Sequence, residues 1–137
     1  MLITTSQGSL APIVPHSASD PLVGQLDAFT ADNLDKLLIE HRDDQVVGGY
    51  LYGQLANILQ LETSLAKVLP LLGEHLIGPL AQQLRVLGAT GVTLIPTDFL
   101  SLLPLHAASY TVDGVVRCLL DEFDVAYAPS VRVLAIA

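Results

Sequence analysis

Two short strand-like runs near the carboxyl end of the sequence limit the fold of this chain most. Val92 to Ile95 lies between Gly91 and Pro96, and Phe123 to Tyr127 is the second run. A short apolar run with glycine or proline at its ends is typical of a strand buried in a sheet with helices on its faces. Since helical segments precede both runs, we predict an α/β fold in which they are core strands.

A turn should follow the first of these strands. Pro96 and Pro104 lack amide donors and restrict the residue before them, so the chain must leave the sheet there. Four leucines should hold this turn against the core: Leu100, Leu102, Leu103 and Leu105.

Three upstream segments have the three- and four-residue apolar spacing of amphipathic helices. We expect these helices at about residues 31–42, 49–69 and 76–87. Thr30 can cap the first, and its apolar face should contain Leu34, Leu37 and Leu38.

The second and third helices are expected to be separate. Pro70 and Gly73 should close the second, and Pro79 is tolerable only near the first turn of the third. The longest uncharged stretch, Gln45 to Leu61, approaches the length of a membrane span, but it contains four polar side chains and three glycines. We interpret it as part of a buried helix.

The first 29 residues predict a hairpin or two edge strands followed by a loop. Leu2 to Thr5 and Leu10 to Val14 are short apolar pieces on either side of a polar turn. Pro12, Pro15 and Pro21 indicate a loop after them.

The composition allows one domain and excludes some partners. The chain has 137 residues, 51% of them hydrophobic and only 15% charged, so part of the apolar surface should remain uncovered. The net charge is −8 and the six basic residues are scattered, which argues against nucleic-acid binding. We expect no membrane association.

Cysteine usage and the N-terminal sequence predict a cytoplasmic protein. Cys118 is the only cysteine, so an internal disulfide and a cysteine-rich zinc site are both excluded. The first residues have neither a basic start nor a continuous apolar core, as a secretory signal would. We expect no cofactor and no metal.

Residues 91–130 resemble the first half of a CHAT domain, the caspase-like cysteine peptidase module. The similarity consists of a strand ending in Leu94-Ile-Pro96, then Leu100, then Leu103-Pro104 with Ala107 behind, then a strand ending in Tyr127-Ala-Pro-Ser130. The helical lead-in is also similar, at Phe29 to Leu34, Leu72-Gly73, Pro79-Leu80, Leu84 and Gly88.

The resemblance implies a single domain over residues 1–137 that is the front portion of a CHAT-like domain. Its parts would be a lead-in at 1–29, a helical region at 30–90 and a strand-loop-strand motif at 91–137. The expected fold is a partial caspase-like one, with a few core strands covered by helices and the remainder of the sheet absent.

In CHAT domains a cysteine activated by a histidine attacks the peptide carbonyl, and each lies at the end of a core strand, the histidine being followed by glycine. The chain ends seven residues after Ser130 and contains neither a His-Gly nor an Ala-Cys pair. We therefore expect no catalytic residue in this chain, and hence no enzyme as it stands.

Other candidate sites have simpler interpretations. Cys118 with His106 could be a nucleophile and base, but Cys118 lies in an apolar run, where a thiol is usually inert, and His106 matches a scaffold position of the CHAT motif. The histidines at positions 16, 41, 75 and 106 lack metal-ligand spacing.

The acidic pairs and the glycines near residue 50 also have simpler interpretations than a site. Asp43-Asp44 and Asp121-Glu122 could act as an acid and base or bind metal, but solvated loop ends explain them better. Gly48, Gly49 and Gly53 lack the lysine and spacing of a phosphate loop, so close helix contact is expected there.

Two functions follow. The first is the non-catalytic N-terminal part of a CHAT-type cysteine peptidase, supporting a caspase-like sheet. The second is a free-standing interaction or oligomerisation module derived from that fold. An unpaired sheet edge and an open apolar face would favour association with the rest of the domain or self-association.

Overall fold

The computed structural model describes residues 1–15, 20–56, 58–130 and 132. It shows the predicted α/β fold, with helices and several small sheets packed on one hydrophobic cluster. The two expected strands are present as β6 (Gly91–Leu94) and β9 (Asp124–Tyr127), which pair in parallel. The expectation that they are buried was wrong, since Leu94 is their only buried residue and three of the four residues of β9 are exposed. The buried cluster takes side chains from both ends of the chain, including Leu2, Phe29, Leu105 and Phe123.

The N-terminal region forms an antiparallel sheet of three strands. The expected hairpin is β1 (Ile3–Thr5) with β2 (Gly8–Ile13), and β3 (Leu22–Leu26) pairs with the other edge of β2. The prediction of a loop was therefore wrong for β3. The loop was predicted from the prolines, but Pro21 directly precedes β3 and does not interrupt it. Pro12 lies within β2, the central strand, a position from which proline is usually excluded.

The first helix, α1 (Ala31–Leu38), begins as predicted. Thr30 accepts a hydrogen bond from the Asn33 amide, and Leu34, Leu37 and Leu38 are buried. The helix ends four residues before position 42, because Ile39 is extended and the chain enters a hairpin of β4 (Glu40–Arg42) and β5 (Gln45–Gly48).

The β4–β5 hairpin was not predicted, and it corrects the expectation of a helix across Gln45 to Leu61. Its turn is Asp43-Asp44, where both residues have positive φ (49° and 62°), as a tight two-residue hairpin turn requires. Gly49 follows with φ 101°, and a Cβ there would lie 2.5 Å from the Leu38 carbonyl oxygen, so the close helix contact expected at the glycines is confirmed for Gly49.

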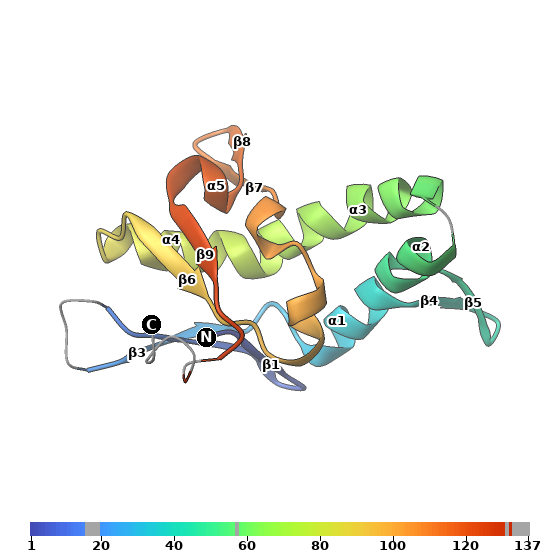
Figure 1. Cartoon of the computed structure of the whole chain (residues 1–137), viewed down its shortest axis with the longest axis horizontal. Helices are drawn as coiled ribbons and strands as arrows, with labels where there is room; N and C mark the ends of the chain where they lie inside the picture. Colours follow the sequence, from blue (N-terminus) through green and yellow to red (C-terminus); the bar gives the residue numbers. More distant parts are fainter. Residues whose placement is uncertain (16–19, 57, 131, 133–137) are drawn as a thin grey trace.

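The predicted second helix is divided into α2 (Tyr50–Ala56) and α3 (Ile58–Leu72). The two are oriented differently in Figure 1, so one apolar stripe does not run through both. Leu55, which the spacing places on the buried face, is 88% exposed as a result.

The predicted break at Pro70 and Gly73 does not occur. Pro70 lies inside α3, and the helix continues through a wider π-helical turn, η1 (Gly73–Ile77), into α4 (Gly78–Val86). Pro79 is in the first turn of α4, as expected. The turn brings the backbone of Gly73 against Ser109, whose amide donates to the Leu69 carbonyl oxygen (3.2 Å). Ser109, 36 residues after Gly73, thus packs at the point where the helix was expected to end.

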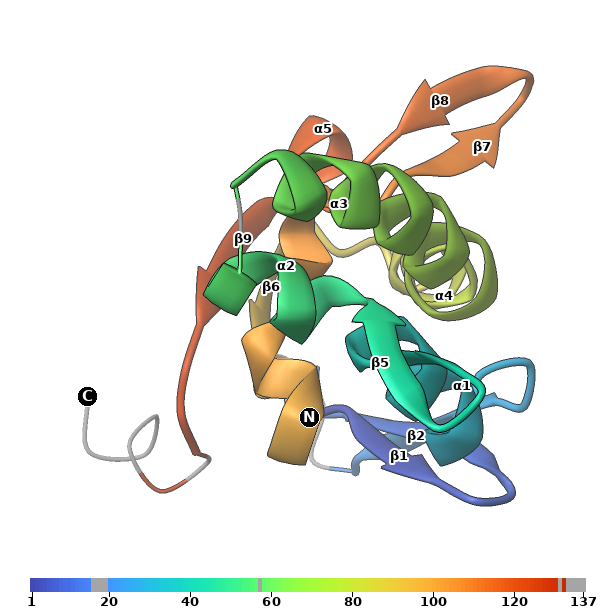
Figure 2. The ribbon, with the colours of Figure 1, turned by 90° about the vertical axis from the view of Figure 1, so that its right-hand side faces the viewer.

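Between β6 and β9 the chain forms two short 3-10 helices, a hairpin and one helical turn. These are η2 (Asp98–Leu102), η3 (Leu105–Ala107), β7 (Tyr110–Val112), β8 (Val115–Arg117) and α5 (Leu119–Glu122). The β7–β8 hairpin projects from the body of the molecule in Figure 2. The sequence contains a signal for this hairpin, because Asp113-Gly114 between β-branched residues favours a tight turn. In the structure both residues have positive φ.

A substitution at Gly73 tests the contact with Ser109. A Cβ at position 73 would lie 1.6 Å from the Ser109 carbonyl oxygen, a backbone atom that cannot rotate away. We expect Gly73→Ala to lower the free energy of unfolding by about 3 kcal/mol or more in a denaturant titration.

Gly88→Ala is the matched control. Gly88 has positive φ (69°), but a Cβ there meets no atom within 4 Å, so only the backbone cost of about 1 kcal/mol is expected. Equal losses in the two variants would show that the helix tolerates a side chain at position 73.

Candidate functional site: the carboxyl end of the parallel strands

The candidate site lies where β6 and β9 end side by side. The two strands pair in register from Gly91–Asp124 to Leu94–Tyr127, so their carboxyl ends meet at the same edge. The amide of Asp124 donates to Thr90 and that of Ala128 donates to Leu94, both at 3.0 Å. In parallel sheets, ligands bind in the crevice beyond the carboxyl ends of the strands.

The other edge of β6 is occupied by the N-terminus of the chain. The Leu2 amide donates to the Ile95 carbonyl oxygen (2.9 Å), and the Leu2 carbonyl oxygen accepts from the amide (3.0 Å) and hydroxyl (3.0 Å) of Thr97. This parallel bridge joins the two sheets in the order β3, β2, β1, β6, β9. Among the described residues, β9 therefore forms one border of this sheet (Figure 2).

A cavity of about 720 Å³ opens at the carboxyl ends. Residues from the end of β6, η2 and the end of β9 line it, together with Met1: Ile95, Pro96, Thr97, Asp98, Ser101, Tyr127, Ala128, Pro129 and Ser130. Its size is within the range of small-molecule and peptide side-chain sites. The predicted turn after β6 thus forms one wall of a cavity.

Apolar side chains anchor that turn, as the sequence predicted for three of four leucines. Leu100, Leu103 and Leu105 are buried. The fourth, Leu102, was expected to pin the turn but is 45% exposed, because η2 is a short helix and its side chains point to more than one side.

His106 and Tyr127 connect the turn to the end of β9. The Tyr127 hydroxyl accepts the backbone N–H of His106 (3.0 Å) and lies 2.9 Å from His106 Nδ1, and the two rings meet edge to face. Burial raises the pKa of the Tyr127 hydroxyl, although the His106 and Leu105 amides act in the opposite direction. The scaffold role predicted for His106 fits these contacts.

Cys118 lies at the start of α5, away from the ends of the parallel strands. Its side chain is half-buried, and its amide donates to the Asp121 carboxylate (2.8 Å) at the start of α5. Among the described residues, no hydrogen bond joins it to His106, whose ring contacts Tyr127. The structure therefore does not assemble the alternative Cys118–His106 pair.

The solvated interpretation of Asp121-Glu122 is wrong for Glu122. Its side chain is only 10% exposed; its carboxylate accepts from the Tyr110 hydroxyl (2.7 Å) and from Arg85 Nε (2.8 Å). Arg85 lies 37 residues away, on α4, so sequence spacing gave no sign of this network. It ties α4, β7 and α5 together behind the strand pair.

The network shifts the pKa values of its members. Burial and the neighbouring Glu122 carboxylate raise the pKa of Tyr110 far above its ordinary value. Burial alone would raise the pKa of Glu122, but hydrogen bonds from Tyr110 and Arg85 and the charges of Arg85 and Arg117 hold it below its ordinary value.

The remaining candidates are not brought together. His41 is exposed on β4, His75 is half-buried in η1, and His16 lies outside the described residues. In the described part of the chain, no group of three or more His, Cys, Asp or Glu side chains could hold a metal ion. Within the same ranges, no helix has the length and apolar character needed to cross a membrane.

Comparison with known proteins identifies the family. The family model described as the CHAT domain matches residues 66–136, just over half of the chain. The chain therefore belongs to the CHAT-domain family, as the sequence motifs indicated. No curated protein and no solved structure matches it. The matched region begins in α3 and includes both parallel strands and the candidate site.

The Glu122 network predicts a pH-dependent stability. Because the pKa of Glu122 is lower in the folded state than in the unfolded chain, its carboxylate stabilises the fold above about pH 5, and this contribution is lost as the pH falls through the folded-state pKa. We expect Glu122→Gln to lower the free energy of unfolding by about 1–2 kcal/mol at pH 7. The difference from wild type should shrink below about pH 4.

Asp124→Asn serves as the control, since Asp124 is an exposed acid next to the network on β9. It should change stability little at either pH. A Glu122→Gln deficit that persists unchanged at about pH 3 would show that the ionised carboxylate is not the stabilising group.

Proposed function

We propose that this chain is the non-catalytic front part of a CHAT-type cysteine peptidase and that it supports a caspase-like sheet. The observation that carries the proposal is the outer edge of β9, which pairs with no strand among the described residues. Residues 124 and 128 bond toward β6, so the backbone groups of Val125 and Tyr127 point the other way, toward the border of the sheet. An outward row of amides and carbonyls is a template for a further strand.

The sheet can extend in only one direction from the parallel pair. Leu2 already occupies the outer edge at the end of β6, so a further core strand would pair with β9. In the family, the strands that carry the catalytic histidine and cysteine follow the Pro-Ser segment, represented here by Pro129-Ser130. Their carboxyl ends would then border the cavity at β6 and β9, which would form one wall of a peptide groove.

No residue of this chain is assigned to the chemical step. Thiolate attack on a peptide carbonyl needs a cysteine whose proton a nearby base removes. In the part of the chain that the structure describes, no hydrogen bond joins Cys118 to His106, whose ring contacts Tyr127, so we propose no catalysis by this chain.

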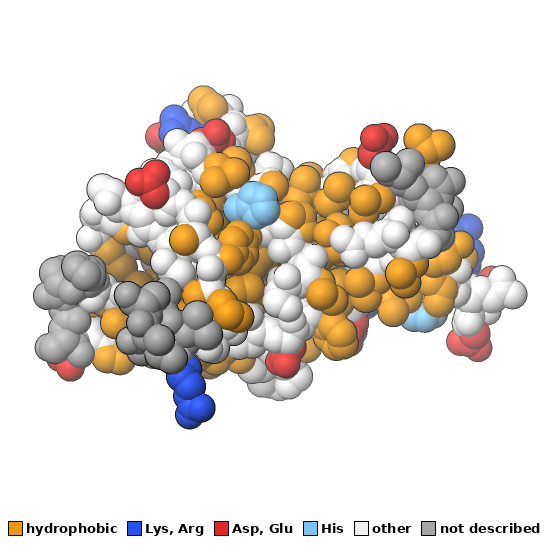
Figure 3. Space-filling model, in the orientation of Figure 1, with side chains coloured by type: hydrophobic (Ala, Val, Ile, Leu, Met, Phe, Trp, Pro, Cys, Tyr) orange, Lys and Arg blue, Asp and Glu red, His pale blue; other side chains and the backbone are white. Residues whose placement is uncertain are grey.

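The second candidate function, an interaction module, is favoured by the exposed apolar side chains. Figure 3 shows hydrophobic side chains across the face formed by η2, η3, α2 and α3. Phe99, Leu102, Leu55 and Leu59 on these elements are exposed, as is Tyr127 at the end of β9. A contiguous apolar face of this kind is typical of a surface that another protein covers.

Strand direction separates the two functions. Two copies related by a two-fold axis present the same edge to each other, so β9 would pair with β9 of the second copy in antiparallel orientation. A continuing core strand of a caspase-like sheet would be parallel to β9.

The first test is the state of the chain in solution. We expect light scattering to show self-association, or an apolar dye to bind to the protein, because the β9 edge and the apolar face are open. Val125→Pro removes an outward amide without removing a hydrogen bond to β6, so it should weaken association. A stable monomer that binds no dye would contradict the open face.

Ala126→Pro is the control, because residue 126 faces β6 and the substitution should lower stability instead. If Val125→Pro associates as wild type does, the β9 edge is not the contact.

A peptidase assay tests the absence of catalysis. We expect the chain to cleave no peptide substrate, and we expect iodoacetamide to modify Cys118 more slowly in the folded than in the unfolded chain. Cleavage that Cys118→Ala abolishes would overturn the non-catalytic assignment.

A further inference from the structure

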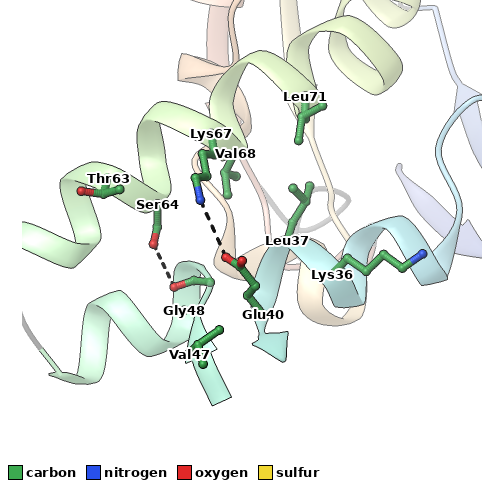
Figure 4. A pocket seen from close by; sticks show the side chains of 11 residues that line it. Lys36, Leu37, Glu40, Val47, Gly48, Thr63, Ser64, Lys67, Val68 and Leu71 are labelled. Atoms are coloured by element: carbon green, nitrogen blue, oxygen red, sulfur yellow. Dashed lines mark hydrogen bonds and ion pairs between the residues drawn. The ribbon is translucent and has the colours of Figure 1, made fainter. Parts of the chain in front are cut away.

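A second cavity lies away from the parallel strands. It has a volume of about 460 Å³, is open to solvent, and is lined by residues of α1, the β4–β5 hairpin and α3 (Figure 4). Neither the family match nor the CHAT motifs assign a role to it. Cavities of this size hold small molecules when an apolar floor is combined with a few placed polar groups.

The floor of this cavity is apolar. Val68 of α3 is 2% exposed and Leu37 of α1 is also buried, while Leu71 and Val47 at its sides are exposed. In Figure 4 the side chains of Leu37 and Leu71 point toward each other across the space between α1 and α3. The interior therefore suits an aliphatic side chain.

Two opposite charges face each other at the cavity. Lys67 Nζ of α3 lies 3.8 Å from Glu40 Oε2 of β4, which is beyond hydrogen-bond distance, and the side chains are 65% and 46% exposed. Gly48 stands opposite Glu40 in the hairpin, and a Cβ there would come within 3.1 Å of Glu40 Oε2, so the glycine leaves room for the carboxylate. The 3.8 Å between Lys67 Nζ and Glu40 Oε2 is comparable to the distance between the ammonium and carboxylate groups of a single α-amino acid.

The neighbouring hydroxyls are acceptors only. Ser64 Oγ donates to the Gly49 carbonyl oxygen (3.0 Å), and Thr63 Oγ1 donates to the Leu59 carbonyl oxygen (3.1 Å). With their protons used, both oxygens can only accept further hydrogen bonds. Figure 4 shows the Thr63 hydroxyl pointing away from Glu40, so only the Ser64 oxygen can add to the Glu40 carboxylate as an acceptor for an ammonium group.

The other lysine of the cavity is engaged elsewhere. Lys36 Nζ donates to the Asp32 carboxylate (2.6 Å), and in Figure 4 its chain points away from Lys67 and Glu40. One cation and one anion thus remain at the mouth of the cavity, rather than a basic cluster.

We propose that this cavity binds a free α-amino acid with an aliphatic side chain. The ligand ammonium would pair with Glu40 and the Ser64 oxygen, its carboxylate would pair with Lys67, and its side chain would fill the space between Leu37, Val68 and Leu71. Parting an exposed ion pair costs little, at most about 1 kcal/mol, and the ligand restores both interactions. A ligand with only one charge leaves either Glu40 or Lys67 without a new partner.

The experiment compares three ligands of the same carbon skeleton. Methyl NMR of the 137-residue chain should show leucine shifting the Leu37 and Val68 resonances at up to about 10 mM. Isoamylamine lacks the carboxylate and isocaproate lacks the ammonium, and each should bind at least about fivefold more weakly than leucine. Equal binding of the three would overturn the proposal, and so would the absence of shifts with leucine.

Single substitutions test whether Glu40 and Lys67 are the charged groups that bind the ligand. Glu40→Gln and Lys67→Met should each weaken leucine binding by about fivefold. The controls are Glu62→Gln, an exposed acid of α3 that does not line the cavity, and Lys36→Met, the lysine directed away. These four side chains are exposed, so the variants should melt as wild type does. Controls that weaken binding as much as Glu40→Gln and Lys67→Met would refute the assignment.

Discussion

The structure depends on the hydrogen bonding of both edges of β6. On one edge Leu2 bonds to Ile95 and Thr97, and on the other β9 pairs along its full length. The first and last parts of the described chain are thereby fixed to the same strand. Loop closure over such separations costs conformational entropy, which the buried cluster shared by the two ends must offset. Within the described ranges, this arrangement also leaves β9 as the border of the sheet on this side.

The elements between β6 and β9 are held by polar contacts behind and beside the strand pair. Glu122 joins Arg85 of α4 to Tyr110 of β7, and Tyr127 joins the end of β9 to η3. Because Glu122 is nearly buried, losing either partner would leave a desolvated group without compensation. These contacts keep the carboxyl ends of the strands at a fixed distance from the turn that carries the CHAT motif.

Membership of the CHAT-domain family and the open edge of β9 together frame the proposed role. The cavity at the strand ends and the cavity between α1 and α3 are physically different. The first is lined by a turn and strand ends, where a groove would be completed by further strands. The second is lined by α1, the β4–β5 hairpin and α3 of this chain, so its proposed ligand does not depend on how the sheet is extended.

The sequence alone determined the features that depend on local chemistry. Propensity and periodicity act over a few residues. They therefore predicted the Thr30 cap, the first hairpin, the two short parallel strands and three of the leucines that anchor the turn after β6. The CHAT motifs depend on the same residues, which is why the family was recognisable before the fold. The Asp113-Gly114 turn carried an equally local signal that was missed.

Tertiary structure determined the contacts between residues that are far apart in the sequence. Pro70 and Gly73 predict a helix end, but Ser109 packs on Gly73 and the helix continues. Asp121-Glu122 predict a solvated pair, but Arg85 and Tyr110 bury Glu122. The cavity between α1 and α3 combines Glu40 with Lys67, 27 residues apart. In each case the partner comes from another element of the fold, which no spacing in the sequence records.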